Sequence, residues 1–331
     1  MSPDTSPNPL WQPSGNRIAA AWLTKFRLEA QRRWHRQLSD YAALHRWSID
    51  HPEEFWSLVW DFSGILGEKG NTIITHRERM PGARWFPEAR LNFAENLLRP
   101  DAGDAGIIFR DERLQRRSLD RAALRRKVAR LAAALRADGI QPGDRIAALM
   151  PNVPDTVVIM LAAASIGAIF TSASPDFGLQ GILDRFGQIE PALLFVTESY
   201  CYNGKRIPLL DKVAAVAGQL PGLKRVIVCR HLSRTLPALT AIPRACPLAD
   251  YLRPWRNTTR IDFTPLPFDH PLYILYSSGT TGVPKCIVHG AGGTLLQHLK
   301  EHRLHADIHP DDRVFYSTTC GWMMWNWLIP A

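Results

Sequence analysis

The chain has 331 residues, of which 46% are hydrophobic and 21% are charged. This composition is typical of a globular protein with a sizeable core and excludes an intrinsically disordered chain. The formal net charge of +9 is carried mostly by arginines on amphipathic segments without an aromatic stacking platform, so it indicates solvated helix faces and not a nucleic-acid surface.

No segment reaches the roughly 18 uninterrupted apolar residues that a membrane-spanning helix needs. The most apolar stretch, residues 153–173, contains Asp155 and is expected to form a buried helix and a strand. Residues 1–16 lack the apolar core of a secretory signal and are expected to form a flexible tail. The five cysteines form no Cys-x-x-Cys pair, which indicates no metal site and predicts a cytoplasmic protein with reduced thiols.

Residues 17–100 are predicted to form a helical, aromatic-rich segment that precedes the main domain. Asn16 is positioned to cap a helix that runs to about His35, with apolar residues at helical spacing on one face. A break at residues 100–103, which read Pro-Asp-Ala-Gly, marks the expected end of this segment.

A second helix is expected after Asp50, which is a candidate N-cap beside Pro52 and two acidic residues in the first turn. This helix carries an apolar stripe made of Phe55, Trp56, Val59 and Trp60. Such an aromatic stripe favours core packing over a cofactor site.

Residues 101–331 alternate between short apolar runs and helical segments. A strand at residues 105–110 is followed by a helix that Ser118 caps and Gly139 ends; its expected buried face is Leu124, Val128, Leu131 and Leu135. Further strands are expected at residues 146–150, 169–172, 193–197, 225–229 and 272–276, and further helices at residues 154–164, 179–188 and 209–218. This alternation predicts an α/β fold with parallel-sheet layers covered by helices. Residues 231–269 are expected to form an irregular connection.

The segment from Pro271 to Lys285, which reads PLYILYSSGTTGVPK, has the features of a phosphate-binding loop. A buried-type strand leads into a bend of glycines and hydroxyls. Glycine lets backbone N–H groups approach a phosphate closely, and the hydroxyls add hydrogen-bond donors. Lys285 adds a positive charge that neutralises phosphate oxygens.

The bend matches neither of two common nucleotide-binding patterns. Residues 279–286 do not supply the Gly-x-x-x-x-Gly-Lys-Ser/Thr of a Walker A loop, and residues 289–293 lack the third glycine of a dinucleotide fingerprint. Residues 276–285 instead resemble the phosphate loop of the adenylate-forming superfamily, which includes acyl-CoA synthetases, luciferases and peptide-synthetase adenylation domains. A generic turn is the alternative, and the ten positions that agree disfavour it.

Other segments carry the same resemblance. Residues 119–147, 162–178 and 318–326 resemble further core motifs of the superfamily. The resemblance implies that the chain forms the N-terminal large domain of the adenylate-forming fold, with residues 101–331 as a partial AMP-binding synthetase domain.

Two features narrow the resemblance to one branch of the superfamily. Residues 41–98 are similar to the N-terminal extension of acetyl-CoA synthetase-like enzymes. Residues 55–62 together with 321–327 are most similar to acetoacetate–CoA ligases. An acetyl- or propionyl-CoA synthetase-like ligase and a non-catalytic, nucleotide-binding remnant remain the alternatives.

The resemblance implies a reaction in which a carboxylic acid and ATP form an acyl adenylate and coenzyme A then displaces AMP. ATP, Mg²⁺ and coenzyme A are the implied cofactor and substrates, with acetoacetate as the acid. The residues implied to bind the ATP phosphates are Ser277, Ser278, Gly279, Thr280, Thr281 and Gly282. Lys285 is the implied catalytic residue beside them.

The resemblance implies roles for two further residues. Trp322 is expected to form a wall of the acyl pocket, with a core tryptophan as the alternative. Lys205 lies in the segment YNGKRIP (residues 202–208), which resembles a coenzyme A-binding loop. Two arginines are expected in that loop, whereas this chain has Tyr202 and Lys205, so a solvent-exposed turn is the alternative.

Members of this family are much longer than 331 residues. The chain is therefore expected to be truncated, to lack the adenine-binding and Mg²⁺-binding segments and the mobile C-terminal domain, and to be inactive by itself. Its expected partners are small-molecule substrates, with no nucleic acid and no membrane.

Overall fold

The computed structural model describes residues 10–99, 106–277 and 282–331. The chain divides into two compact units. The first unit comprises residues up to Gly64 together with Leu296–His309, and the second comprises Ile65–Leu295 and Pro310–Ala331. The division of the sequence near residues 16 and 100 stays a prediction.

The first unit is helical. Its helices are α1 (Gly15–Ala20), α2 (Trp22–Trp34), α3 (Tyr41–Asp50) and α4 (Pro52–Phe62), and it also contains the π-helical turn η2 (Glu301–His305). Phe26 of α2 is fully buried and makes edge-to-face contacts with Phe55 and Phe62 of α4. Such aromatic pairs add to the energy of burial alone, so the apolar stripe on α4 serves packing, as predicted.

The start of the first helix differs from the prediction. Ser14, and not Asn16, caps α1. The expected continuous helix is interrupted at Ala21, whose backbone is extended (φ −60°, ψ 141°). The interruption leaves the Trp22 N–H free to donate to the carboxylate of Asp307 at 2.9 Å, a partner that the local sequence does not reveal.

The predicted cap at Asp50 was also wrong, because Asp50 is the last residue of α3. Asp40 caps that helix by accepting the Ala43 N–H at 2.8 Å. Helix α4 begins at Pro52 without a side-chain cap. Proline tolerates the first helical position because its fixed φ suits a helix and its missing N–H would have no partner there.

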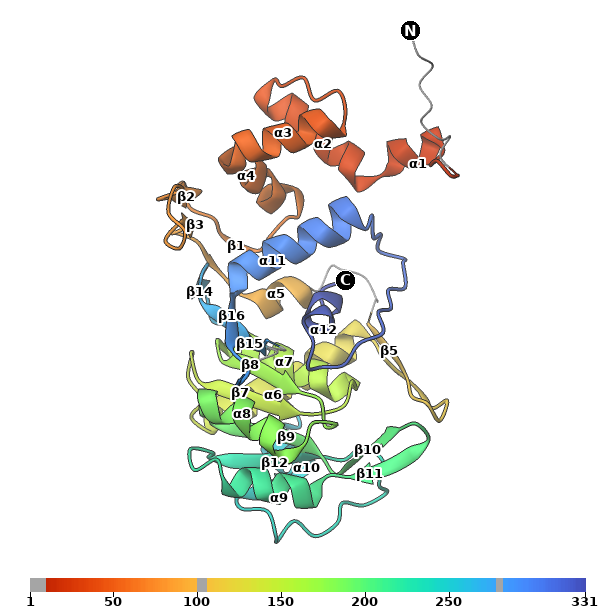
Figure 1. Cartoon of the computed structure of the whole chain (residues 1–331), viewed down its shortest axis with the longest axis vertical. Helices are drawn as coiled ribbons and strands as arrows, with labels where there is room; N and C mark the ends of the chain where they lie inside the picture. The colour runs from red at the N-terminus through yellow and green to blue at the C-terminus, as the bar shows by residue number, and fades with distance from the viewer. Residues whose placement is uncertain (1–9, 100–105, 278–281) are drawn as a thin grey trace. The chain divides into compact units, whose positions relative to one another are not determined.

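The second unit is built on a seven-stranded sheet with the order β13-β12-β9-β7-β8-β15-β16 (Figure 1). The strands are β7 (Arg145–Leu149), β8 (Ile169–Ala173), β9 (Leu193–Thr197), β12 (Arg225–Cys229), β13 (Ala245–Pro247), β15 (Pro271–Tyr276) and β16 (Cys286–Gly290). All neighbouring strands are parallel except β15 and β16. The predicted α/β class is confirmed.

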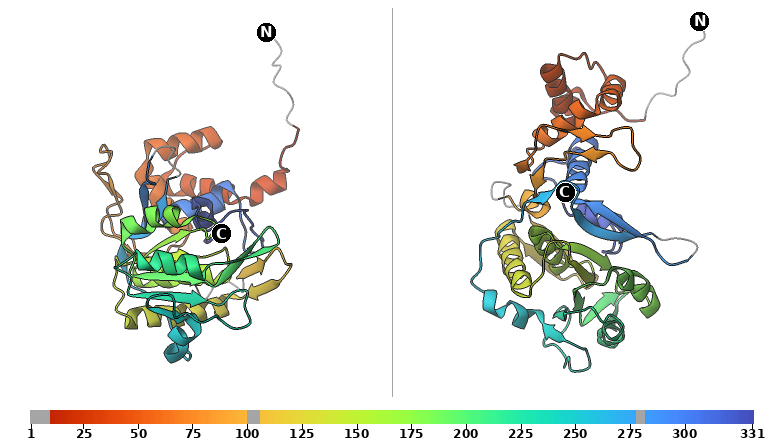
Figure 2. Two further views of the ribbon diagram at one scale, coloured as in Figure 1. Left: turned by 60° about the horizontal axis from the view of Figure 1, so that its bottom comes forward. Right: turned by 90° about the vertical axis from the view of Figure 1, so that its left-hand side faces the viewer.

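Helices cover both faces of this sheet (Figure 2). Helices α8 (Leu179–Ile189) and α9 (Leu210–Gly218) pack on one face against alternate strand residues. Helices α6 (Arg121–Ala137) and α7 (Pro154–Ile166) lie against each other on the opposite face. Every residue of α7 except Asp155 is buried, and β8 is buried throughout, which confirms the buried helix and strand predicted for residues 153–173.

The predicted cap at Ser118 was wrong. Ser118 lies in β6 (Arg116–Leu119), which pairs with β5 (Ile107–Arg110) in an antiparallel hairpin outside the main sheet. Asp120 caps α6 by accepting the Ala123 N–H at 2.6 Å. The helix therefore starts only after the hairpin ladder ends. The predicted apolar face of α6 is buried, and Gly139 follows its end with φ +74°.

The remaining elements are short. Residues 231–269, expected to be irregular, include the end strand β13, α10 (Leu248–Leu252), the 3₁₀ turn η1 (Arg253–Trp255) and β14 (Leu266–Pro267). The others are β1 (Gly67–Glu68), β2 (Ile74–Thr75), β3 (Arg84–Trp85), β4 (Arg90–Leu91), α5 (Phe93–Leu97), β10 (Ser199–Tyr202), β11 (Lys205–Pro208), α11 (Ala291–Lys300) and α12 (Met323–Leu328). None of the helices in the described part of the chain is long and apolar enough to cross a membrane.

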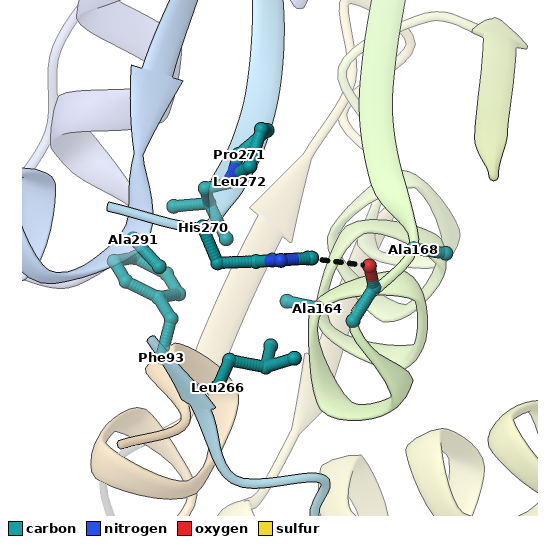
Figure 3. Close-up of a pocket in the computed structure, with 9 residues that line it drawn as sticks. Phe93, Ala164, Ala168, Leu266, His270, Pro271, Leu272 and Ala291 are labelled. Carbon is teal, nitrogen blue, oxygen red and sulfur yellow. Dashed lines mark hydrogen bonds between the residues drawn. The ribbon is translucent and has the colours of Figure 1, made fainter. Parts of the chain in front are cut away.

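An apolar crevice lies beside the C-terminal end of α7 (Figure 3). His270 reaches across it, and its Nε2 lies 2.8 Å from the carbonyl oxygen of Gly167. Gly167 has φ +81°, and a Cβ there would lie only 3.0 Å from the side chain of Leu266. The crevice leaves no space for a water molecule, so it is a packing joint and not a ligand site.

Asn92 joins three segments of the second unit. Its side chain is buried, and its Nδ2 donates to the carbonyl oxygens of Ala164, Ser165 and Thr264 at 2.9–3.1 Å. Its Oδ1 accepts the Glu95 N–H and thereby caps α5.

We expect Asn92→Ala to lower the free energy of unfolding by about 3 kcal/mol, because a buried amide network and a helix cap are lost together. Asn71→Ala is the matched control, because the Asn71 side chain is exposed. Urea unfolding followed by circular dichroism measures both changes, and equal stability of the two variants would contradict the role of Asn92.

Candidate functional site

The two ends of the predicted phosphate loop are hydrogen-bonded to each other. Tyr276 and Cys286 are opposite residues in the ladder between β15 and β16. Just beyond them, the Ser277 N–H donates to the Lys285 carbonyl oxygen at 2.9 Å. The Lys285 N–H donates to Ser277 Oγ at 3.0 Å. These two bonds close the base of the loop.

The structure brings Ser277, Gly282 and Lys285 to one bend. Gly282 is exposed with φ +89°, a left-handed conformation that favours glycine. The predicted phosphate-binding residues Ser278, Gly279, Thr280 and Thr281 lie outside the described residues, so their role stays a prediction.

The base of the loop determines which donors remain for a ligand. The Ser277 amide is already bonded, so its hydroxyl hydrogen is the donor that this residue retains. Lys285 is exposed, and its ammonium makes no ion pair within residues 10–99, 106–277 and 282–331. A hydroxyl and a cation are therefore available at the base for binding an anion.

Helix α8 supports the loop base from the side. The Gln188 Nε2 donates to the Pro284 carbonyl oxygen at 2.8 Å. The Arg185 guanidinium lies 4.4 Å from the ring centre of Phe177 and 5.8 Å from that of Tyr276. The sequence analysis did not identify Arg185 or Gln188, because only the fold brings α8 beside the loop.

The end of β15 at Tyr276 is held by a pair of hydroxyl groups. Thr171 Oγ1 of β8 lies 3.0 Å from the Tyr276 hydroxyl. Burial raises the pKa of Tyr276, so this phenol is neutral at physiological pH. The strand that precedes the loop is thus anchored within the sheet.

The loop lies at the carboxyl edge of the parallel strands, because it follows β15, which runs parallel to β8. The segments after β9 and β12 lie at the same edge. In open α/β sheets, ligands bind in crevices outside this edge. The position of the loop therefore fits a nucleotide site.

A hollow of about 450 Å³ is lined by Tyr316, Ser317, Thr318, Thr319, Trp322 and Met324. Trp322 is 56% exposed and therefore does not belong to the core. The core tryptophan of this region is Trp325, which is fully buried and donates from Nε1 to Asn152 Oδ1 at 2.9 Å. The acyl-pocket role of Trp322 stays a prediction.

Lys205 is exposed at the start of β11. Its hairpin is anchored elsewhere, because the Asn203 and Gly204 N–H groups donate to the carboxylate of Glu112 at 3.1 and 2.6 Å. Within the described ranges, Lys205 makes no ion pair with a residue of the loop or the hollow. Its predicted contact with coenzyme A stays a prediction.

Glu198 is a buried carboxylate that sequence reasoning missed. Its side chain is 1% exposed and follows β9 directly. It accepts the N–H groups of His231, Leu232 and Ser233 at 2.7–2.8 Å. Burial raises the pKa of Glu198, but the three N–H bonds together lower it by more, so the pKa lies below its usual value. This anchored anion holds the segment after β12 at the carboxyl edge.

The last feature of the site is the arrangement of side chains that could bind a metal ion. Within the part of the chain that the structure describes, no three His, Cys, Asp or Glu side chains lie close enough together to hold a metal ion. Mg²⁺ is usually held by only one or two carboxylates together with substrate phosphates, so the predicted Mg²⁺ stays a prediction.

The parallel sheet and the closed loop at its carboxyl edge are features of a nucleotide-binding α/β protein. The chain belongs to the AMP-binding enzyme family, whose profile matches residues 105–329. A second profile, that of the acetyl-coenzyme A synthetase N-terminus, matches residues 41–97. These matches confirm the resemblance that the loop sequence predicted.

The chain is similar to acetoacetyl-coenzyme A synthetase of Rhizobium meliloti, with 50% identity over 97% of this chain and 49% of the relative. Malonamoyl-CoA synthetase of Penicillium aethiopicum is 42% identical over 97% of this chain and 46% of that protein. The solved structure of acetoacetyl-CoA synthetase from Streptomyces lividans matches with a TM-score of 0.90 and 41% identity, over 98% of this chain and 49% of that one. The chain thus spans about half the length of the curated relatives that it matches.

We expect Glu198→Gln to lower the free energy of unfolding at pH 7 by about 2 kcal/mol, because a charged acceptor binds N–H groups more strongly than a neutral one. The folded pKa of Glu198 is lowered, so its stabilisation is present above the unfolded pKa of about 4.3 and is lost as pH falls through the folded pKa. The difference between the two proteins should therefore shrink in acid.

Urea unfolding between pH 7 and pH 3 checks this expectation. Glu78→Gln is the matched control, because that side chain is 74% exposed. A stability difference that stays constant over this pH range would contradict the assigned role of Glu198.

Proposed function

We propose that this chain supplies the phosphate loop and the acyl pocket of an enzyme that joins acetoacetate to coenzyme A at the expense of ATP. The observation that carries the proposal is the closed base between Ser277 and Lys285 at the carboxyl edge of the sheet. The acyl-CoA synthetase names of the relatives support the same reaction class.

The proposed reaction has two steps. In the first, a carboxylate oxygen of acetoacetate attacks the α-phosphorus of ATP, and the bond from that phosphorus to the bridging oxygen of pyrophosphate breaks. In the second, the thiol sulfur of coenzyme A attacks the acyl carbon and loses its proton, and AMP leaves with the electron pair of the broken carbon–oxygen bond. The products are acetoacetyl-CoA, AMP and pyrophosphate.

In this proposal, the loop stabilises the negative charge that develops on the phosphates of ATP. Negative charge on the departing pyrophosphate increases during the first step, and a positioned cation stabilises that transition state more than the ground state. Lys285 is the cation, and the Ser277 hydroxyl is a neutral donor beside it. Gln188 and Arg185 hold the base of the loop in place, so little reorganisation is needed when ATP binds.

The choice of acid is supported by the lining of the hollow. Acetoacetate and malonamate both carry a carbonyl group at the third carbon, and the names of the relatives include an acetoacetyl and a malonamoyl synthetase. Ser317 supplies a hydroxyl group that can donate to such a carbonyl. The indole of Trp322 is a flat wall that limits the length of the acid.

The proposal is tested with a chimera in which this chain is continued by the remaining half of the Rhizobium meliloti relative. Acid-dependent exchange between ATP and labelled pyrophosphate reports the first step without coenzyme A. Acetoacetate should give the highest kcat/KM in a panel with malonamate, acetate, propionate and butyrate. A higher value for acetate or propionate would assign the chain to another short-acid ligase, and no exchange with any acid would contradict the proposal.

We expect Lys285→Ala to lower kcat/KM for exchange by about a hundredfold, because loss of one transition-state donor typically costs about 3 kcal/mol. Lys205→Ala is the matched control, because exchange does not involve coenzyme A. That control should raise the KM for coenzyme A in the full reaction and leave exchange unchanged. An active Lys285→Ala chimera would rule out the assigned role of the cation.

We expect Trp322→Ala to shift preference toward longer acids, because removing the indole lengthens the hollow. The ratio of kcat/KM for hexanoate to that for acetoacetate should rise by about tenfold or more, in line with the 1–3 kcal/mol that a methylene in a fitted pocket contributes. Trp11→Ala, at a tryptophan that is 68% exposed and far in sequence, should leave the ratio unchanged. An unchanged ratio in both variants would place the acyl pocket elsewhere.

A further inference from the structure

The turn between β8 and α8 is attached to the carboxyl edge of the sheet. We call its residues, 174–178, the β8–α8 turn. Ser174 is buried at the start of the turn. The Lys212 ammonium of α9 donates to the carbonyl oxygens of Pro175 and Phe177 at 2.9 and 3.0 Å. These contacts hold the backbone of the turn and thereby determine where the Phe177 ring lies.

The β8–α8 turn reaches the phosphate loop through Arg185 of α8. The Arg185 guanidinium lies over two rings, 4.4 Å from the centre of Phe177 and 5.8 Å from that of Tyr276. A cation over an aromatic face is attracted to it, and more strongly where water is excluded. Arg185 is half-buried. It therefore connects the turn to the residue that directly precedes the base of the loop.

The same turn also lies against the segment that leads into the hollow. A Cβ added at Gly321 would lie 3.3 Å from the backbone nitrogen of Ser174 and 3.8 Å from the Phe177 ring. Trp322, the next residue along the chain, lines the hollow. The Phe177 ring is therefore a neighbour both of the start of the hollow and of Arg185.

We propose that Phe177 and Arg185 are positioning residues that set the distance between the acid in the hollow and the phosphates at the loop. We call Phe177, Arg185 and Tyr276 the stacked link. This inference rests on the proposed function and extends it to two side chains that do not touch the reacting atoms. They act through Tyr276 on the base of the loop.

The geometry of the first step explains why such a link matters. A carboxylate oxygen has to approach the α-phosphorus at a fixed distance and direction, and small displacements lower the rate by large factors. Removal of Arg185 leaves the Ser277 hydroxyl and the Lys285 ammonium in the chain, so both donors can still bind a phosphate. The loss is therefore expected in kcat and not in the KM for ATP.

A purely structural role within α8 is the alternative for Arg185. Its Nη1 donates to the Gly181 carbonyl oxygen at 2.6 Å, a bond that stays within the helix. A role limited to that bond would change the stability of α8 and leave the base of the loop unaffected. The two roles therefore differ in their effect on the Ser277 and Lys285 amides.

The first measurement uses this chain by itself and needs no substrate. The Ser277 and Lys285 N–H groups close the base of the loop, so their amide hydrogen exchange reports how often the base opens. Arg185→Met keeps a flexible side chain of similar length and removes the cation. It should speed the exchange of both amides by about tenfold, which is the size expected for a half-buried cation that loses two rings.

Two controls accompany this measurement, which mass spectrometry with fragmentation can follow. The amides of β9, a central strand of the same sheet, should keep their exchange rates in Arg185→Met. Arg126→Met removes an exposed arginine on α6 and should change neither Ser277 nor Lys285. Unchanged exchange of these two amides in Arg185→Met would overturn the proposal in favour of the role within α8.

The second measurement uses the chimera and the exchange between ATP and labelled pyrophosphate. The acyl adenylate formed per molecule without coenzyme A counts the active sites, so unfolded protein does not mimic a lower kcat. Arg185→Met should lower kcat per active site by about tenfold or more and change the KM for ATP and for acetoacetate by less than about twofold. A raised KM for ATP with an unchanged kcat would overturn the proposal, because Arg185 would then act on phosphate binding.

Phe177→Leu tests whether the two side chains act as one unit. By itself it should lower kcat by a factor similar to that of Arg185→Met. In the Arg185→Met background it should lower kcat by less than about threefold, because the partners of one contact are not additive. Two effects that simply multiply would overturn the stacked link.

The two measurements separate this proposal from the proposed function. A chimera without acid-dependent exchange contradicts the acetoacetate ligase, whereas faster hydrogen exchange at Ser277 and Lys285 in Arg185→Met still supports the stacked link. An active chimera whose Arg185→Met variant keeps its kcat overturns the positioning roles and supports the ligase.

Discussion

The change from parallel to antiparallel pairing at β15 determines where the candidate site forms. Parallel neighbours need a long crossover connection, whereas antiparallel neighbours can be joined by a short loop. β15 is parallel to β8 on one side and antiparallel to β16 on the other. The chain therefore turns back on itself at the carboxyl edge of the sheet, and the Ser277–Lys285 bonds hold the two ends of that turn together.

Neighbouring elements contact the base of this turn. The fully buried β8 supplies the Thr171 hydroxyl that lies against Tyr276, and α8 supplies the Gln188 bond to Pro284 and the Arg185 contact with two rings. Farther along the same edge, the Glu198 carboxylate gathers three N–H groups from the segment after β12. These contacts connect the base of the loop and the segment after β12 to the sheet.

Residues 313–328 include both buried and exposed aromatic side chains. Trp325 is fully buried and bonded to Asn152, whereas Trp322, three residues earlier, is mostly exposed. One turn of chain therefore anchors the region in the core and presents an aromatic surface outward.

Local features of the chain were determined by the sequence itself. The alternation of apolar strands and amphipathic helices predicted the α/β class, the spacing of Leu124, Val128, Leu131 and Leu135 predicted the buried face of α6, and the loop sequence predicted the family. These features depend on neighbouring residues and on the periods of helix and strand, which a single sequence displays directly.

Only the tertiary structure decided the interactions between distant residues. Where the predicted first helix is interrupted, the Trp22 N–H donates to Asp307, which lies 285 positions away. Gln188 binds Pro284 across 96 positions, and Glu198 binds the N–H of His231 across 33. A helix N-terminus or a buried carboxylate bonds to whichever polar group the fold brings within about 3 Å. Local propensity cannot rank partners that become neighbours only after the chain has folded.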